Sequence, residues 1–355
     1  MKSIMEELHL DAMVITDPYN MRHISGFRGG EGILYISESQ KVLITDSRYT
    51  EQAGKESDYT VIEENANHKR EVILNECISA EGKKSGFSMG YEDESLLCAQ
   101  FDKLKAALKV EQWVPMGGRV DALRRIKTEE ELSYLQKAEE IGDKAFDKIL
   151  TILKPGMTEL EVGAELEYLM KKEGAENTSF DTIIASGVNS SMPHAIPGEK
   201  KLEEGDFVTM DFGCKYKGYC SDMTRTVVLG KASEKQKEIY NTVLKAQLAA
   251  LDALKAGVTG KSVDKVARDI ITEAGYGDCF GHGLGHSVGL FIHENPRLSP
   301  SDETVLQAGM VETVEPGIYV PGFGGVRIED MVVVTEDGYR NLAHSPKELL
   351  EVPVK

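Results

Sequence analysis

The segment DFVTMDFGCKYKGYCSDMTRTVVL, residues 206–229, alternates apolar and polar positions on both sides of a turn near Lys215–Gly218. This pattern predicts a β-hairpin. Because facing positions lie equally far from the turn, Asp211 and Asp222 are expected to be cross-strand neighbours, with Cβ atoms about 4.5–5.5 Å apart. Like charges placed opposite each other destabilise a hairpin, so a bound cation is the natural explanation. The alternative, two exposed aspartates on a surface hairpin, is disfavoured by the valines and the methionine that mark both strands as buried.

A second acidic pair repeats this arrangement. Its first member, Glu315, lies 104 residues after Asp211. Glu315 in TVEPGIYV and Glu329 in GVRIEDM are equally far from the middle of the loop PGFGG. Strand alternation places Tyr319 on the same face as Glu315. The same rule places Arg327 on the face of Glu329. A tyrosine and an arginine beside metal-bound carboxylates can hold the ligands and pass protons. In the alternative interpretation Arg327 only neutralises Glu329, and the two roles are compatible.

Four carboxylates in one cleft would repel one another and take up protons unless cations neutralised them. Two divalent ions supply four positive charges against four negative ones, so a two-metal centre is predicted, and such a centre points to hydrolysis. His286 in GHGLGHSVG adds an imidazole. This donor set favours Mn²⁺, with Co²⁺ or Zn²⁺ as alternatives, whereas a thiolate from Cys214 or Cys220 is disfavoured beside hard carboxylates. The predicted ligands are Asp211, Asp222, His286, Glu315 and Glu329.

The glycines around His282 and His286 could also suggest a phosphate-binding loop, but no helix with a P-loop lysine follows. Glycines between histidines instead allow close backbone packing and let the imidazoles point inward. Four of the eight histidines lie in such motifs, including His194 in NSSMPHAIPG and His293 in FIHENPR. The other four have no supporting neighbours, so we expect only these four to serve the site.

A chain of 355 residues exceeds the usual size of one hydrophobic core, so two domains are expected. In the first ~115 residues short apolar runs alternate with helical spacing, which predicts an α/β domain. The break WVPMGG at residues 113–118 places the boundary near residue 120, which gives domains 1–120 and 121–355. Strands are expected at 10–16, 32–37 and 41–45, and helices at 71–82 and 94–109.

In the second domain the order of elements appears twice. Capping boxes at Thr128 and Thr158 open two helices, and a box at Ser233 opens a third. Ser233 lies 105 residues after Thr128, so two similar halves with the active site between them are expected. Coincidence among common helix signals is the alternative. Helices are expected at 128–153, 158–174, 233–257 and 262–275, and strands within 180–229 and 280–335.

Composition restricts the partners and the compartment. With 41 Lys and Arg against 59 Asp and Glu, the formal net charge is −18. Such a surface repels phosphate backbones and anionic lipids, so neither nucleic acid nor membrane is an expected partner. Five scattered cysteines without a CxxC motif favour reduced thiols. The start MKSIMEELHLDAMV lacks the apolar core of a signal peptide, and no run reaches the ~18 apolar residues of a membrane span, so a cytoplasmic protein is expected.

These motifs resemble those of the pita-bread metallopeptidases, the group that holds prolidase, aminopeptidase P and methionine aminopeptidase. The order D…D…H…E…E carries the resemblance in the second domain. In the first domain, YNMRHISGFRG at 19–29 and ITDSRYTEQA at 44–53 resemble the creatinase-like domain of the proline-specific branch. The resemblance implies an α/β (α+β) chain, with a creatinase-like N-terminal α/β domain followed by a pita-bread domain of two pseudo-symmetric ααβ halves. Methionine aminopeptidases resemble only the C-terminal half, and creatinase lacks the metal ligands that are intact here.

The resemblance further implies hydrolysis of the peptide bond that precedes proline. By the family motif, Asp211 would bind one metal, His286 and Glu315 the other, and Asp222 and Glu329 would bridge them. A hydroxide between the ions would be the nucleophile, since metal coordination lowers the pKa of water toward neutrality. A protein with all five ligands is expected to be an active dinuclear metallopeptidase. A peptide-binding homologue without catalysis is the remote alternative.

Further roles follow from the same motif positions. Glu315 would pass a proton to the leaving amine. His194 and His293 would stabilise the tetrahedral intermediate and orient the scissile bond, and removing one such donor typically costs ~10²–10³ in rate. His282 would support the substrate. Together with Tyr319 and Arg327, these residues complete the site that the resemblance implies.

Substrate length depends on Arg297, four residues after His293. It resembles the arginine that is thought to clamp the free carboxylate of a dipeptide in prolidases, which favours a Xaa-Pro dipeptidase. Similar HExPR stretches occur in short aminopeptidase P-like proteins, and Arg297 could also pair with a surface acid. An Xaa-Pro aminopeptidase acting on longer peptides therefore stays open. The expected substrate is a small peptide with proline at its second position, and a homodimer is usual for relatives with this N-terminal domain.

Overall fold

The computed structural model describes residues 1–354, and its chain divides into two units, Met1–Arg124 and Arg125–Lys355. The boundary expected near residue 120 falls among two short 3₁₀ turns, Gly117–Arg119 and Asp121–Arg124, at the end of the first unit. The chain thus leaves the first unit through an irregular segment.

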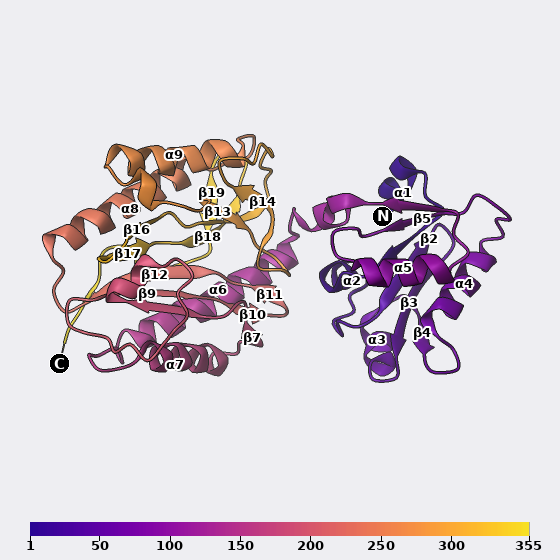
Figure 1. Cartoon of the computed structure of the whole chain (residues 1–355), viewed down its shortest axis with the longest axis horizontal. Helices are drawn as coiled ribbons and strands as arrows, with labels where there is room; N and C mark the ends of the chain where they lie inside the picture. The colour runs from indigo at the N-terminus through magenta and orange to yellow at the C-terminus, as the bar shows by residue number, and fades with distance from the viewer. Residues whose placement is uncertain (355) are drawn as a thin grey trace. The chain divides into compact units, whose positions relative to one another are not determined.

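A six-stranded mixed sheet with the order β4-β3-β2-β1-β5-β6 forms the centre of the first unit (Figure 1). Alternate residues of its central strands belong to two separate hydrophobic clusters, so both faces of the sheet are covered. This double burial explains why these strands form continuous apolar runs in the sequence. The strands are β1 Ala12–Ile15, β2 Ile33–Ser37, β3 Lys41–Asp46, β4 Thr60–Glu64, β5 Ser88–Tyr91 and β6 Gln112–Pro115; the helices are α1 Lys2–Leu8, α2 Pro18–Ser25, α3 Thr50–Glu56, α4 Arg70–Ala80 and α5 Cys98–Ala107. The three predicted strands and two predicted helices are confirmed.

The end of regular structure predicted at residues 113–118 is wrong for residues 113–115, which lie in a strand. Trp113 and Pro115 lie in the edge strand β6, which pairs in parallel with β5. Proline is tolerated there because it ends an edge strand, where no ladder partner requires its missing N–H. The indole of Trp113 packs edge-on against the ring of Phe101, with centroids 5.4 Å apart. The regular structure therefore ends after Pro115 rather than before Trp113.

The second unit contains four long helices, each opened by a side-chain cap. The capping boxes predicted at Thr128, Thr158 and Ser233 are confirmed, because each hydroxyl accepts a hydrogen bond from the backbone N–H three residues on. The last helix begins two residues before its predicted start, since Thr259 and not Ser262 is the capping residue. The helices are α6 Glu129–Ile149, α7 Glu159–Lys172, α8 Glu234–Ala253 and α9 Gly260–Glu273.

Two sheets, one in each half, lie between these helix pairs. In Figure 1, α6 and α7 lie on one side of the strands and α8 and α9 on the other. One hydrophobic cluster joins α6 and α7 to the four-stranded sheet β20-β12-β9-β8, and another joins α8 and α9 to the five-stranded sheet β14-β13-β15-β18-β19. The strands are β8 Ile183–Ser186, β9 Phe207–Phe212, β12 Met223–Leu229, β13 Gly285–Ser287, β14 Glu294–Leu298, β15 Val311–Val314, β18 Asp330–Val334, β19 Tyr339–Asn341 and β20 Glu351–Val352. The predicted repeat of two helices and a sheet is confirmed.

The first acidic hairpin has a different register from the predicted one. Asp211 in β9 pairs with Thr224 in β12, so it does not face Asp222 directly. The turn is Lys217–Gly218, where both residues have positive φ angles of 48° and 74°. It joins β10 Cys214–Tyr216 to β11 Tyr219–Cys220, which pair with each other beside β7 Asn177–Thr178. Because the shift is by two residues, strand alternation is preserved and both aspartates still face the same cavity.

The second acidic hairpin has the predicted register. Val314 pairs with Asp330, and Gly317 in β16 Gly317–Val320 pairs with Arg327 in β17 Gly324–Arg327. Both ladders therefore follow the register that sets Glu315 opposite Glu329. These two residues lie in the short gap between the two ladders, where the backbone leaves one strand pair and enters the next.

Candidate metal centre

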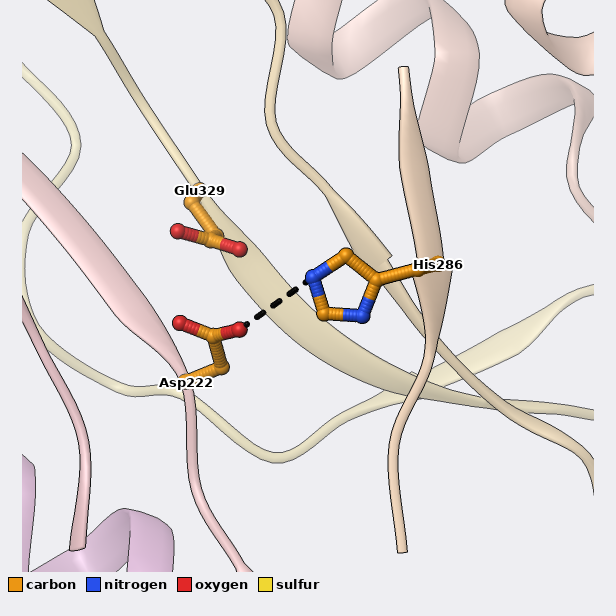
Figure 2. Close-up of side chains that lie close together, drawn as sticks. All are labelled: Asp222, His286 and Glu329. Atoms are coloured by element: carbon orange, nitrogen blue, oxygen red, sulfur yellow. Dashed lines mark ion pairs between the residues drawn. The ribbon is translucent and has the colours of Figure 1, made fainter. Parts of the chain in front are cut away.

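Three of the predicted ligands come together as one buried group. Atoms of Asp222, His286 and Glu329 that could bind a metal all lie within 4.8 Å of one another (Figure 2). Asp222 directly precedes β12, Glu329 directly precedes β18, and His286 lies on β13. The two carboxylates thus come from the two halves, and their side chains converge on one imidazole.

The other two predicted ligands lie beside this group. The Nε2 atom of His286 is 3.5 Å from a carboxylate oxygen of Asp222 and 3.5 Å from one of Glu315. Asp211 lies outside the tight group and accepts a hydrogen bond from Arg327 at 2.5 Å. All five predicted ligands line the same cavity. The structure therefore brings the five together, with Asp211 at the edge of the set.

The donor atoms fit divalent cations. Within residues 1–354, one carboxylate oxygen of Asp211 and one of Glu329 are buried and have no hydrogen-bond partner. Leaving such acceptors unsatisfied costs free energy, whereas a cation would satisfy both. The set is made of carboxylate oxygens and one imidazole nitrogen, which matches the ligand preference of hard or borderline ions.

Electrostatics lead to the same conclusion. Burial, together with repulsion from neighbouring carboxylates, raises the pKa of Asp222 and of Glu329 well above their ordinary values. Burial also raises the pKa of Glu315 to about 7. Without cations, the raised pKa values favour the protonated forms of these carboxyls, so the cluster keeps its negative charge only when positive charge is bound nearby.

His286 is prepared to bind a metal through Nε2. Burial and the neighbouring His293 lower its pKa to about 3, which keeps the ring neutral. Its Nδ1 lies 3.2 Å from the carbonyl oxygen of Ser287, and since a carbonyl only accepts, Nδ1 carries the proton. The lone pair of Nε2 then faces the carboxylates. A Cβ on the preceding Gly285 would meet the carbonyl oxygen of Thr313 at 1.9 Å, so close packing explains this glycine of the motif.

A chain of hydrogen bonds runs behind the ligands. Arg327 donates to Asp211 and, through Nη1, to the hydroxyl of Tyr319 at 2.8 Å. Because an arginine only donates, the Tyr319 hydroxyl can give its proton to Nε2 of His282, which lies 2.9 Å away. Burial lowers the pKa of His282 to about 4, so this ring is neutral and able to accept. The carboxylate that Arg327 hydrogen-bonds is thus Asp211. Its charge also acts on Glu329 and opposes the burial that raises the pKa of that carboxyl, so Arg327 does more than neutralise Glu329.

The cavity holds the predicted substrate-side residues. It has a volume of about 850 Å³, and ten of the eleven predicted site residues line it, with Tyr319 set behind them. His194 and His293 are exposed at the cavity, and the His293 ring packs edge-on against His286 with centroids 4.6 Å apart. Partial desolvation and the nearby Arg297 lower the pKa of His293, so its ring is neutral. Arg297 lies on β14, and its side chain donates to the carbonyl of His293 at 3.4 Å.

Several residues that hold the predicted ligands were not among those expected from the sequence. Thr224 donates to Glu329 at 2.6 Å, and Thr313 donates to Glu315 at 3.2 Å. Each threonine lies two residues from an acidic ligand, so strand alternation could have identified both. Glu139 on α6 accepts from the backbone N–H of Asp222 at 3.3 Å. No local signal marks that helical residue, because its role depends on the packing of α6 against the hairpin.

Comparison with known families identifies the chain. Residues 133–336 match the model of metallopeptidase family M24, and residues 1–126 match that of the creatinase/prolidase N-terminal domain. The chain belongs to metallopeptidase family M24. This M24 chain is 43% identical to a protein of Pyrococcus furiosus named Xaa-Pro dipeptidase, over 98% of the chain and 97% of that relative.

Solved structures of M24 relatives share the whole fold. A structure described as Xaa-Pro dipeptidase from Bacillus anthracis is 44% identical, with a TM-score of 0.94 over 98% of this chain and 97% of that one. A structure described as X-Pro aminopeptidase from Thermotoga maritima is 39% identical, with a TM-score of 0.91 over 99% of this chain and all of that one. The M24 chain is accordingly a metal-dependent hydrolase with the expected two-part architecture. Among its described helices, none is both long and apolar enough to cross a membrane.

Proposed function

We propose that this M24 metallopeptidase hydrolyses the peptide bond that precedes proline and that its preferred substrates are Xaa-Pro dipeptides. The observation that carries the proposal is one cavity that holds both the metal-ligand cluster and the guanidinium of Arg297. Within residues 1–354 this guanidinium has no acidic side chain within ion-pair distance, so it is available for the free carboxylate of a dipeptide. The dipeptidase name of the Pyrococcus relative supports the same substrate class.

The proposed site holds two divalent ions, with Mn²⁺ favoured by the hard donor set. Asp211, Asp222, His286, Glu315 and Glu329 would hold these ions. The unsatisfied oxygens of Asp211 and Glu329 support the assignment. When bound, the ions polarise the scissile carbonyl and activate water for attack.

The chain's own residues orient the substrate and move protons. The hydroxyl of Thr313 holds one oxygen of Glu315, which leaves the other oxygen free to pass a proton to the leaving imide nitrogen of proline. His194 and His293, both at the cavity, are assigned to donate hydrogen bonds to the substrate carbonyl as charge develops on its oxygen. His282 and Tyr319 keep Arg327 in place, and Arg327 keeps Asp211 in place.

An Xaa-Pro aminopeptidase is the second candidate. The Thermotoga structure carries that name, and the cavity is wide and borders an exposed loop in which Ile196 is 88% exposed. Such an opening would admit peptides that continue beyond proline. The two candidates share the metal centre and differ only in whether Arg297 requires a free carboxylate directly after proline.

Substrate length and Arg297 together decide between the candidates. With Mn²⁺-loaded protein, we expect a higher kcat/KM for Ala-Pro than for Ala-Pro-Ala. Arg297→Ala should raise the KM for Ala-Pro about 30-fold or more, because the bound carboxylate loses its charged partner. Arg340→Ala, an exposed arginine on β19 outside the cavity, is the matched control and should leave KM unchanged.

Faster cleavage of the tripeptide, together with an unaffected Arg297→Ala variant, would favour the aminopeptidase. If Mn²⁺, Co²⁺ and Zn²⁺ each fail to support hydrolysis of either peptide, a peptide-binding homologue without catalysis becomes the better assignment. We further infer a cytoplasmic homodimer. The five cysteines are free, which fits a reducing compartment, and the dimer is tested by the mass in solution, expected at twice that of one chain.

A further inference from the structure

Glu159 is a buried acidic residue that lies outside the metal centre. It is the first residue of α7, and its side chain is completely buried. Burying a carboxylate is costly unless hydrogen bonds replace the lost water. The position at a helix N-terminus offsets only part of this cost. The rest must come from its partners, and those partners all belong to one loop.

Five hydrogen bonds tie Glu159 to both ends of the segment 186–198. Its Oε1 accepts from the backbone N–H and the hydroxyl of Ser186, at 2.7 Å and 2.8 Å. The side-chain amide of Asn189 donates to both carboxylate oxygens, at 3.1 Å and 3.2 Å. Its Oε2 accepts from the backbone N–H of Gly198 at 3.2 Å. One side chain thus closes the base of the loop, from the end of β8 to Gly198.

The opposite side of this loop is fixed to the metal centre. The hydroxyl of Ser190 accepts from the backbone N–H of Gly325 on β17 at 2.8 Å. The carbonyl of Pro193 accepts from Arg327, the same guanidinium that holds Asp211. A Cβ on Gly325 would meet the backbone oxygen of Ser190 at 2.3 Å, so the two segments lie in close contact.

His194 lies between these two attachments. Directly before it is Pro193, bound to Arg327, and four residues after it is Gly198, bound to Glu159. At the tip, Ile196 is 88% exposed and His194 is exposed as well, whereas Ala195 between them is buried and donates from its backbone N–H to the carbonyl of Met192. An exposed imidazole can act on a substrate only if its backbone is held in place, so the attachments at both ends set where His194 can reach.

We propose that Glu159 is a positioning residue for the reaction and acts by holding the loop that carries His194. The inference rests on the proposed function, because the position of the loop affects the reaction only if His194 contacts the substrate. Glu159 is not among the residues that line the cavity, and its hydrogen-bond partners are Ser186, Asn189 and Gly198 rather than a predicted metal ligand. It supplies the rigid base that a donor on an exposed loop requires.

Glu159→Gln tests the proposal without changing side-chain volume. The amide nitrogen of glutamine cannot accept, so in either orientation Asn189 loses one acceptor. Ser186 or Gly198 loses its acceptor as well, depending on which oxygen is replaced. Glu161→Gln is the matched control, because Glu161 lies on the same helix and, within residues 1–354, its side chain accepts only from the capping residue Thr158. Asn189→Ala is the second variant, since it removes one attachment from the loop side and leaves the buried carboxylate in place.

Two measurements give separate answers. In hydrogen exchange, amides of residues 187–198 should exchange about 10-fold faster in Glu159→Gln than in the control, and Asn189→Ala should show a smaller increase. With Mn²⁺ and Ala-Pro, kcat should fall about 10- to 100-fold in Glu159→Gln while metal content stays unchanged. In a His194→Ala background the same substitution should lower kcat by less than about twofold, because residues that act as a unit are not additive.

An equal loss of kcat in both backgrounds would overturn the inference, since Glu159 would then act independently of His194. Unchanged exchange of the loop in both Glu159→Gln and Asn189→Ala would also overturn it. Failure of the proposed function looks different, because the unmodified protein would then hydrolyse neither Ala-Pro nor Ala-Pro-Ala with any of the three metals.

Discussion

The hydroxyl of Thr224 joins two functional side chains of the site. It donates to one oxygen of Glu329 and accepts from Nε of Arg327 at 3.0 Å. Glu329 is therefore turned so that its other oxygen, which has no hydrogen-bond partner, is left for a cation. Contacts behind a ligand commonly change metal affinity as much as some ligands do, because they fix the orientation of the donor atom.

Thr224→Val should weaken metal binding while keeping the fold. Valine has the shape of threonine but neither donates to Glu329 nor accepts from Arg327, so Mn²⁺ affinity should fall about 10-fold or more. The measurement is calorimetric titration of metal-free protein with Mn²⁺. Thr242→Val, on an exposed face of α8, is the control. Equal affinities for the two variants would show that Thr224 does not orient Glu329.

At the scale of elements, the turns decide how the ligands face each other. The second hairpin could be predicted because its glycine-rich loop PGFGG has an evident centre at Gly322, where φ is 77°. The first could not, because its turn is Lys217–Gly218 and a lysine at positive φ gives no recognisable signal. Helix starts were predictable at Thr128, Thr158 and Ser233, since a capping box is a local interaction.

Gly218→Ala should destabilise the protein by about 1 kcal/mol or more, because the residue has a φ of 74°, which an L-residue adopts only with strain. The helical Gly163→Ala is the control. An added Cβ there would make an ordinary contact with Ile184 at 3.5 Å, so stability should rise by up to about 1 kcal/mol. Urea denaturation of both variants measures the difference. A Gly218→Ala variant as stable as the unmodified protein would argue against a positive φ at this position.

For the second unit as a whole, the two halves meet at the metal centre. Arg225 on β12 forms a fully buried ion pair with Asp330 on β18, at 2.8 Å, and donates to the backbone carbonyl of Glu329. This pair joins the halves beneath the ligands without any ion. Above it, the carboxylates Asp222, Glu315 and Glu329 repel one another, so the bound ions are expected to stabilise the unit as well as to serve catalysis.

Removing the metal should make stability fall as pH rises through about 7, which is the raised pKa of Glu315. Asp222 and Glu329 then keep raised pKa values in the folded state, so the folded protein holds protons that the unfolded chain has released. Stability from such groups is present at low pH and lost as pH rises. The buried histidines do not oppose this trend above pH 7, because the unfolded imidazole is already neutral there.

The measurement is the Tm of chelator-treated protein at pH 7 and pH 8.5, with Mn²⁺-loaded protein as the control. We expect the Tm of the metal-free form to fall by several degrees and the gap between the two forms to widen. A metal-free Tm that rises over this interval would contradict protonated carboxyls in the empty cluster.

The sequence by itself determined the repeated helices and sheet, the capping residues and the identity of the acidic and histidine residues that line the cavity. These features depend on local hydrogen bonds and on strand alternation, both of which are set by residues close together in the sequence. The tertiary structure alone decided that Asp211 pairs with Thr224, that Arg327 binds Asp211, and that Glu159 holds the loop of His194. Those relations arise where separate segments pack together, and the free energy of that packing depends on the whole fold.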